Sequence, residues 1–123
     1  MTDEQKIILV VEDEEETAEL FSEMLKVSGY KVVSSSRSQN AIELIKDHPP
    51  NGIVLDVMLP DVSGLEVLRF VRKTPEFSQI PVVVVSAKAL PSDVAAGLDA
   101  GATSYLTKPV SYIDLRLAVE NAL

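Results

Sequence analysis

Residues 52–60 read Gly-Ile-Val-Leu-Asp-Val-Met-Leu-Pro, and the apolar run that opens this stretch ends at the acidic residue Asp56. A second run, Ile7-Ile8-Leu9-Val10-Val11, ends in a similar way at Glu12-Asp13. Continuous apolar runs of this kind are typical of strands that are buried on both faces of a parallel sheet. The two stretches therefore predict a parallel sheet whose strands end in acidic side chains.

Apolar runs and helical patterns alternate along the rest of the chain. Three further strands are predicted over residues 30–33, 80–85 and 103–107. Helices are predicted from a cap at Asp13 to Gly29, over residues 40–47, 65–72 and 92–100, and from a cap at Ser111 to the C-terminus, whereas residues 34–38 read as a polar loop. Five β-α units in a row specify one α/β domain over residues 1–123, with helices on both faces of the sheet and right-handed crossovers.

The bulk composition limits the kind of partner. The formal net charge is −8, which argues against direct nucleic-acid binding and suits a protein that binds a cation or a basic partner. The chain has no cysteine, which fits a cytoplasmic location. Its start, Met1-Thr2-Asp3-Glu4, does not resemble a secretory signal, and no apolar run is long enough to cross a membrane.

Polar groups stand at the carboxyl ends of four predicted strands: Glu12-Asp13, Asp56, Ser86 and Lys108. In a doubly wound sheet these ends meet at one edge, where ligands bind. Carboxylates that crowd together repel unless a cation neutralises them, and oxygen ligands of this kind suit Mg²⁺. A carboxylate beside a metal ion and a lysine is a candidate phosphoryl acceptor.

Four stretches of the chain resemble the signature blocks of response-regulator receiver domains of two-component signal transduction. They are Leu9 to Glu14, Leu55 to Gly64, Val84 to Ala87 and Tyr105 to Pro109. The resemblance covers nearly the whole chain. It implies a CheY-like, flavodoxin-like three-layer sandwich with strand order 2-1-3-4-5, an order that comes from the family and not from the residues.

The resemblance also implies a phosphorylation site with a bound metal ion. Asp56 resembles the phosphoacceptor and Asp13 the carboxylate that binds Mg²⁺ directly. Glu12 resembles the acid that reaches the metal through water, and Met58 would contribute only its backbone carbonyl.

A switch is implied by the same resemblance. Lys108 resembles the lysine that pairs with Asp56 and then with a phosphoryl oxygen, and the Lys108-Pro109 peptide bond would be cis. Ser86 resembles the hydroxyl that binds the phosphoryl group, and Tyr105 the aromatic residue that swings inward behind it.

The implied function is phosphorelay signalling without enzymatic turnover beyond self-phosphorylation and slow self-dephosphorylation. A sensor histidine kinase or histidine phosphotransfer domain would supply the phosphoryl group to Asp56. The fourth helix, fifth strand and fifth helix would then change their surface for a downstream effector or for an activated homodimer. Both a stand-alone receiver and a part excised from a longer regulator fit the sequence.

Three other functions fit the sequence less well. A phosphohydrolase resembling the haloacid dehalogenase group would need a second Asp at position 58, where this chain has Met58. A flavodoxin-like cofactor binder would need a phosphate-binding loop where the acidic run 12–16 would repel a phosphate. A pseudo-receiver that binds partners without phosphorylation is disfavoured, because the acids, the hydroxyl and the lysine are all present.

Some positions depart from the family pattern or carry separate hypotheses. Val110 stands where an aromatic residue is common and would loosen packing beneath the last helix. Lys88 and Met58 border the site and would tune the lifetime of the acyl phosphate. Gly97 would make the fourth helix easier to remodel. His48 is interpreted as a loop residue.

The last helix carries two apolar groups. A core stripe is predicted from Leu115, Ala118, Val119 and Ala122. Ile113 and Leu117 project on another side of the helix, where they either pack against the fourth helix or form an apolar docking or dimerisation patch.

Overall fold

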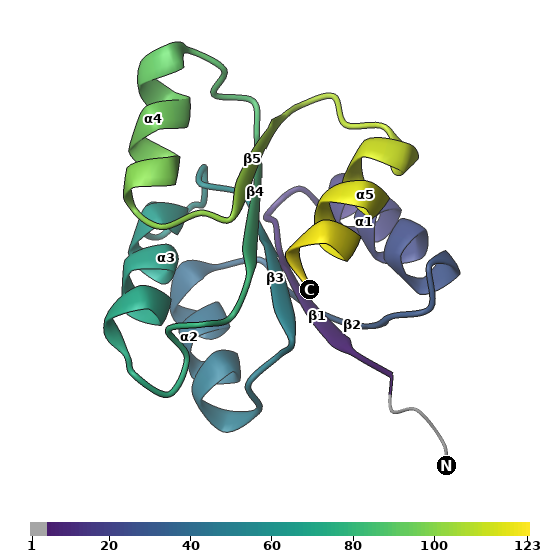
Figure 1. Ribbon diagram of the computed structural model, residues 1–123, viewed down its shortest axis with the longest axis horizontal. Helices are drawn as coiled ribbons and strands as arrows, with labels where there is room; N and C mark the ends of the chain where they lie inside the picture. Colours follow the sequence, from purple (N-terminus) through teal and green to yellow (C-terminus); the bar gives the residue numbers. More distant parts are fainter. Residues whose placement is uncertain (1–4) are drawn as a thin grey trace.

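The alternating apolar and helical segments form a parallel sheet in the computed structural model of the protein, which describes residues 5–123 (Figure 1). The five strands are ordered β2-β1-β3-β4-β5, which confirms the order expected from the family resemblance. The strands are β1 (Ile7–Val11), β2 (Lys31–Ser35), β3 (Gly52–Leu55), β4 (Val82–Ser86) and β5 (Ser104–Thr107). The helices are α1 (Glu15–Val27), α2 (Ser38–Asp47), α3 (Gly64–Lys73), α4 (Pro91–Asp99) and α5 (Tyr112–Ala122).

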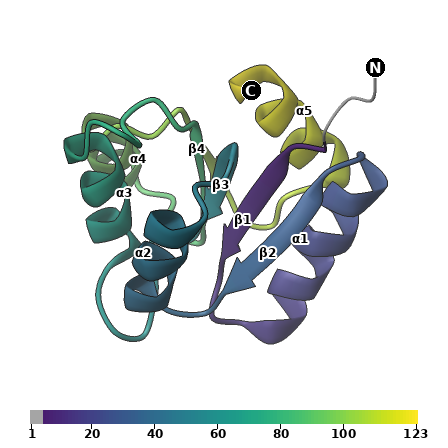
Figure 2. The ribbon, with the colours of Figure 1, turned by 90° about the horizontal axis from the view of Figure 1, so that it is seen from below.

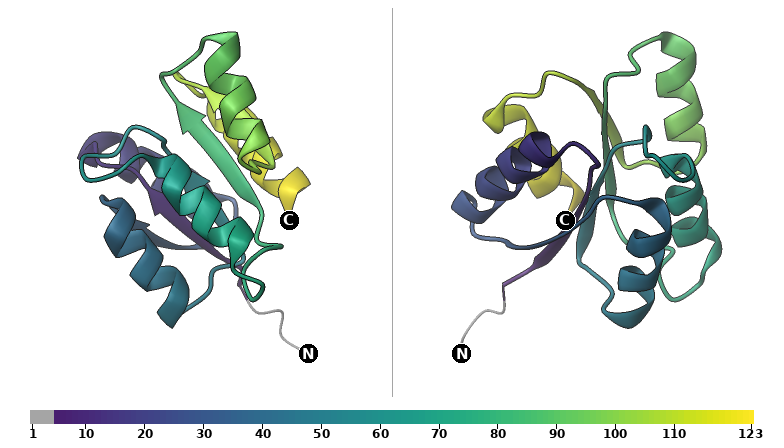
Figure 3. Two further views of the ribbon diagram at one scale, coloured as in Figure 1. Left: turned by 90° about the vertical axis from the view of Figure 1, so that its left-hand side faces the viewer. Right: turned by 180° about the vertical axis from the view of Figure 1, so that it is seen from behind.

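Two helical layers cover the sheet. Helices α2, α3 and α4 lie on one side and α1 and α5 on the other, as Figure 1 and the right-hand view of Figure 3 show. Alternate residues of β1 point to the two faces of the sheet. Leu9 and Val11 belong to the apolar core cluster on the side of α2 and α3, and Ile8 and Val10 belong to the cluster on the side of α1 and α5. Burial on both faces explains why these strands are continuously apolar.

The strand β1 lies inside the sheet between β2 and β3 (Figure 2). Val10 is in register with Ser34 of β2 and with Val54 of β3. This pairing extends β2 to Ser35, so the prediction of a polar loop over residues 34–38 was wrong at both of its ends. Ser34 and Ser35 belong to the strand, and Ser38 begins α2 with a fully buried side chain.

The predicted cap of the first helix was also wrong. Helix α1 begins at Glu15 after Glu14, and the Glu14 side chain makes no capping hydrogen bond. Asp13 belongs instead to the acidic group at the end of β1. At the other end of the chain the Ser111 hydroxyl accepts a hydrogen bond from the Asp114 amide at 3.1 Å, which confirms the predicted cap of α5.

Two sequence expectations about α5 and its surroundings are also settled. Leu115 and Val119 are buried, with Ala118 and Ala122 packed beside them, so the predicted core stripe is confirmed. The peptide bond between Lys108 and Pro109 is cis, as the resemblance implied. No helix within residues 5–123 combines the length and apolar character that crossing a membrane requires, and Met1–Glu4 lie outside the described residues.

Candidate functional site

Asp56 directly follows β3, and the sheet holds its backbone in place. Its amide donates to the Val11 carbonyl at 3.0 Å, which continues the pairing of β3 with β1. The residue is only 6% exposed. Its Oδ1 accepts a hydrogen bond from the Met58 amide at 2.9 Å, so the loop after β3 turns around the carboxylate. Oδ2 therefore remains to face other groups at the strand ends.

Lys108 connects the ends of three strands. Its Nζ lies 2.9 Å from Asp56 Oδ2 and also forms an ion pair with Glu12 Oε1. The Lys108 amide donates to the Ser86 carbonyl at 2.9 Å, which fixes the lysine backbone beside the end of β4. The ammonium group thus lies between two buried carboxylates, Glu12 at the end of β1 and Asp56 at the end of β3.

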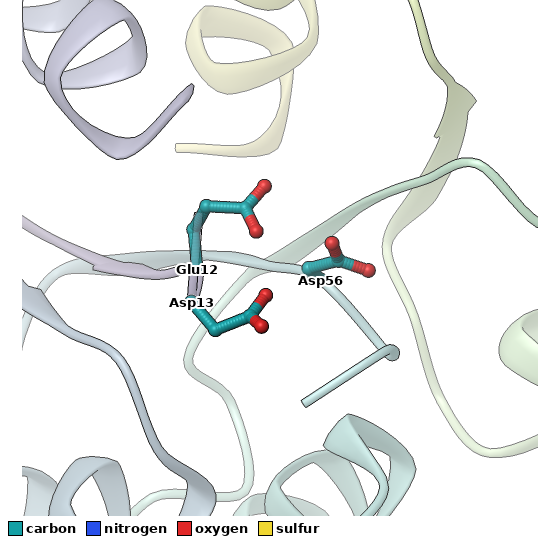
Figure 4. A group of neighbouring side chains, drawn as sticks. All are labelled: Glu12, Asp13 and Asp56. Atoms are coloured by element: carbon teal, nitrogen blue, oxygen red, sulfur yellow. The ribbon is translucent and has the colours of Figure 1, made fainter. Parts of the chain in front are cut away.

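Three carboxylates meet at this edge of the sheet. One oxygen each from Glu12, Asp13 and Asp56 lies within 4.8 Å of the others. Figure 4 shows the three side chains extending to the same side, with Glu12 and Asp13 after β1 and Asp56 after β3. Asp13 is exposed, whereas Glu12 and Asp56 are buried. We call these three residues the acid cluster.

The acid cluster has the donor chemistry of a divalent-cation site. Three carboxylates carry more charge than the single Lys108 ammonium offsets, and an exposed member leaves the cluster open to solvent. Hard cations such as Mg²⁺ take one or two carboxylates, carbonyl oxygens and water. A hollow lined by Asp13, Met58, Ser63 and Lys88, among others, lies beside the cluster.

Burial and neighbouring charges shift the titration of these groups. Burial raises the pKa of Glu12, and the Asp56 carboxylate raises it further, against the opposing effect of Lys108. Burial disfavours the charge on Lys108, but its hydrogen bonds with Glu12 and Asp56 outweigh this, so the pKa of Lys108 is raised overall. Lys108 is therefore held in its charged form beside two carboxylates.

Ser86 and Tyr105, the two predicted switch residues, both contact the backbone of Lys88. Ser86 is fully buried at the end of β4, and its Oγ accepts a hydrogen bond from the Lys88 amide at 3.2 Å. The Tyr105 hydroxyl donates to the Lys88 carbonyl at 2.7 Å. Burial raises the pKa of the Tyr105 phenol. One peptide segment thus contacts both side chains.

The loop after Asp56 is held by residues that the sequence did not single out. Asp61 accepts hydrogen bonds from the Ser38 and Gln39 amides at 3.0 and 2.9 Å, so it caps the start of α2 from a distant part of the chain. These amides lower the pKa of Asp61 to about 2. The Ser38 hydroxyl donates to the Val62 carbonyl at 2.7 Å. Together these contacts fix the loop that lies between Asp56 and α3.

Glycine is required at the start of α3. The Gly64 amide donates to the Val57 carbonyl at 2.9 Å, which brings the first turn of the helix against the end of β3. A Cβ at position 64 would meet the Asp56 carbonyl oxygen and would lie 2.7 Å from the Val57 Cα. The side chain of Ser63 then caps α3 by accepting from the Leu65 amide. The Asp56 backbone and α3 are therefore in close contact.

The apolar residues outside the core include the two that the sequence placed on α5. Ile113 is 57% exposed and Leu117 43% exposed, so neither is buried against α4. Leu98 of α4 is 47% exposed. Val110, which follows the cis bond, packs against the core cluster of α1 and α5.

Comparisons with known proteins agree on one family. The family model described as "Response regulator receiver domain" matches residues 8–120. The polar-differentiation response regulator DivK of Brucella anthropi is 35% identical over 106 residues, which make up 86% of each chain.

Solved structures show the same fold. A putative response regulator from Chloroflexus aurantiacus superposes with a TM-score of 0.93 at 29% identity, and the match covers 97% of this chain and 98% of the other. The Mn²⁺-bound form of response regulator Rcp1 superposes with a TM-score of 0.81 at 31% identity, over 94% of this chain and 90% of the other.

Proposed function

Because this chain belongs to the response regulator receiver domain family, we propose that it is a phosphorylation-controlled switch in which Asp56 accepts the phosphoryl group. The observation that carries the proposal is the setting of the Asp56 carboxylate. It is buried at the end of β3, contacts the Lys108 ammonium at 2.9 Å and stands next to two further acids. Residues 1–123 would form one such domain.

The acid cluster fits Mg²⁺ as the cofactor. Asp13 and Asp56 would bind the ion directly with the Met58 backbone carbonyl, and Glu12 would reach it through water. When bound, Mg²⁺ would offset negative charge on the phosphoryl group and on the carboxylates around it.

The residues of the chain account for the rest of the transfer. An Asp56 oxygen would attack the phosphorus of a phosphohistidine or of a small-molecule phosphodonor, forming a P–O bond as the bond to the donor breaks. The Met58 amide, 2.9 Å from Oδ1, would orient the carboxylate so that the other oxygen faces the donor. Lys108 would offset the charge that develops on the phosphoryl oxygens. Transfer then needs no further acid or base from the protein.

The output would be a change of surface, since receiver domains are generally signalling domains that carry out no enzymatic turnover. Ser86 would bind the new phosphoryl group, and the Lys88 peptide that contacts Ser86 would carry the change to Tyr105. The surface of α4, β5 and α5 would then bind a downstream effector or a second copy of the chain. The exposure of Ile113 and Leu117 supports an apolar contact there.

The phosphoryl donor would be a sensor histidine kinase or a histidine phosphotransfer domain, which a small-molecule donor can replace in the test. The protein is incubated with acetyl phosphate and its intact mass is measured with Mg²⁺, with a chelator, and in Asp56→Asn. We expect a gain of one phosphoryl group that requires both Mg²⁺ and Asp56. No adduct under any condition would favour a pseudo-receiver that binds partners without phosphorylation.

A further inference from the structure

Gly97 lies in the last turn of α4, two residues before the helix ends at Asp99, and faces Tyr105 of β5. The residue is buried, and a Cβ built on it would lie 2.7 Å from Tyr105 Cδ2 and 2.8 Å from Cε2. Carbon atoms that are not bonded do not approach so closely, since their optimal separation is about 3.5–4.0 Å. The aromatic ring therefore occupies the space that any other side chain at position 97 would need.

This steric reason accounts for the glycine where a backbone reason does not. Among the described residues the glycines with positive φ are Gly29 and Gly101, so Gly97 has a backbone conformation that alanine also adopts. Glycine in the interior of a helix destabilises it relative to alanine. Gly97 therefore has a specific contact with the Tyr105 ring, and the remodelling role expected of it from the sequence stays a prediction.

The ring cannot easily move aside while its hydroxyl keeps its partner. Tyr105 is held at one end by its backbone in β5, which pairs with Val84 of β4. At the other end its hydroxyl donates to the Lys88 carbonyl at 2.7 Å. A methyl group at position 97 would press on the ring between these two points. The clash would be removed if the hydrogen bond from the Tyr105 hydroxyl to the Lys88 carbonyl broke and the ring turned away from α4.

We propose that Gly97 is the positioning residue that lets Tyr105 lie inward against α4 in the unphosphorylated chain. This inference rests on the proposed function and adds a regulatory consequence to it. The phosphoryl group on Asp56 would then reinforce an arrangement of α4 and β5 that already exists, and would not have to create it. The chain would bind its effector to a measurable extent before phosphorylation, and Gly97→Ala would make that binding depend on phosphorylation.

The test follows Tyr105 directly by ¹⁹F NMR of protein labelled with 3-fluorotyrosine. The chain has three tyrosines, and Tyr105→Phe assigns the resonance of interest. In the unphosphorylated wild type we expect the Tyr105 resonance to lie away from the position it has in urea, and to shift little when beryllofluoride is added as a phosphoryl mimic. In Gly97→Ala we expect it to move toward the urea position and to return when beryllofluoride is added.

Two controls separate this contact from general effects on the helix. Ala96→Gly changes the glycine content of α4 at an exposed position and should leave the Tyr105 resonance in place. Gly97→Ala should destabilise the wild type but stabilise a Tyr105→Ala background, because alanine favours the helix once the ring is gone. That change of sign would not arise from a position that acts only on helix stability.

Two results would overturn the proposal. One is a wild-type Tyr105 resonance that lies at the urea position before any phosphoryl mimic is added. This measurement uses the wild-type protein alone, so it does not depend on whether a variant folds. The other is a Tyr105 resonance that Gly97→Ala leaves unchanged. Failure of the proposed function gives a different pattern: beryllofluoride would shift no resonance in any variant, while Gly97→Ala would still move that of Tyr105.

Discussion

Replacing Lys108 with methionine keeps an unbranched side chain of similar length but removes the ammonium group that contacts Glu12 and Asp56. Those two carboxyl side chains are only 2% and 7% exposed, so water cannot readily take the place of the lysine. The substitution therefore leaves two buried carboxylates facing each other without their counter-ion. Lys108→Met should therefore affect both the phosphorylation site and the stability of the fold.

The size of the effect follows from the geometry. Oxygens of Glu12 and Asp56 lie within 4.8 Å of each other, and at an effective dielectric constant of about 20 two charges at that distance repel by roughly 3 kcal/mol. Removing one partner of a buried ion pair costs about 3–5 kcal/mol in general. We expect Lys108→Met to lower the free energy of unfolding by about 3–5 kcal/mol near neutral pH without divalent cations.

The loss should depend on pH in a known direction. Burial and then the charge of Asp56 raise the pKa of Glu12, whose usual value is 4.5, and loss of Lys108 would raise it further. A carboxyl group whose pKa is raised by folding destabilises the fold when it is ionised. That penalty grows as the pH rises through the folded-state pKa and disappears below the unfolded-state pKa. The destabilisation caused by Lys108→Met should therefore shrink as the pH falls toward 4.5.

The assay is urea unfolding followed by circular dichroism in the presence of a chelator, with linear extrapolation to water. Lys88→Met is the matched control, because Lys88 is exposed and lines the hollow beside the acid cluster. It should change the unfolding free energy by less than about 0.5 kcal/mol. Adding Glu12→Gln to Lys108→Met should restore part of the loss. A loss below about 1 kcal/mol, or an equal loss in both lysine variants, would show that the Lys108 ammonium group does not stabilise the two buried carboxylates to this extent.

Three further predictions concern other parts of the fold. Asp61→Asn should flatten the acid unfolding curve between about pH 4 and pH 2, because the folded-state pKa of Asp61 is lowered to about 2 and its stabilising effect is lost as the pH falls through that value. If acid titrations of Asp61→Asn and of the wild type, followed by circular dichroism, coincide, this expectation is wrong. Gly64→Ala should lower the free energy of unfolding by about 1–3 kcal/mol and slow phosphoryl transfer, because the new methyl group would press on the backbone of Asp56 and Val57. Urea unfolding and timed intact-mass measurements check both effects, and a variant as stable and as fast as the wild type would count against the close contact. Leu117→Glu should weaken association of the phosphorylated chain with itself or with an effector, measured by sedimentation or binding titration, whereas unchanged association would exclude that patch.

Much of the fold could be predicted from local patterns. Runs such as Ile7–Val11 are apolar at every position because both faces of β1 are covered, and this pattern leaves little choice but a parallel sheet. The end of β2 was missed, because Ser34 and Ser35 look like loop residues. They are held in the strand because they pair with Val10 and Val11 of β1. This pairing joins distant parts of the chain, so the local sequence pattern does not reveal it.

The residues of the candidate site could be chosen from the sequence because they stand at strand ends. Their contacts could not be predicted in the same way. The cap that Asp61 provides for α2 joins residues 23 positions apart, and only the folded chain brings them together. The contact of Gly97 with Tyr105 likewise depends on how α4 crosses β5. A lone glycine in a helical pattern indicates a weak helix. It does not reveal that an aromatic ring fills the space beside the glycine.

If Asp56 carries the phosphoryl group, locating the modified residue in the chain will show it. After incubation with acetyl phosphate and Mg²⁺, borohydride reduces an aspartyl phosphate to homoserine, which peptide mass spectrometry can place in the chain. We predict homoserine at position 56, present with Mg²⁺ and absent with a chelator. Homoserine at position 13 or at another acid, or none in a protein shown to be folded, would mean that Asp56 is not the phosphoacceptor.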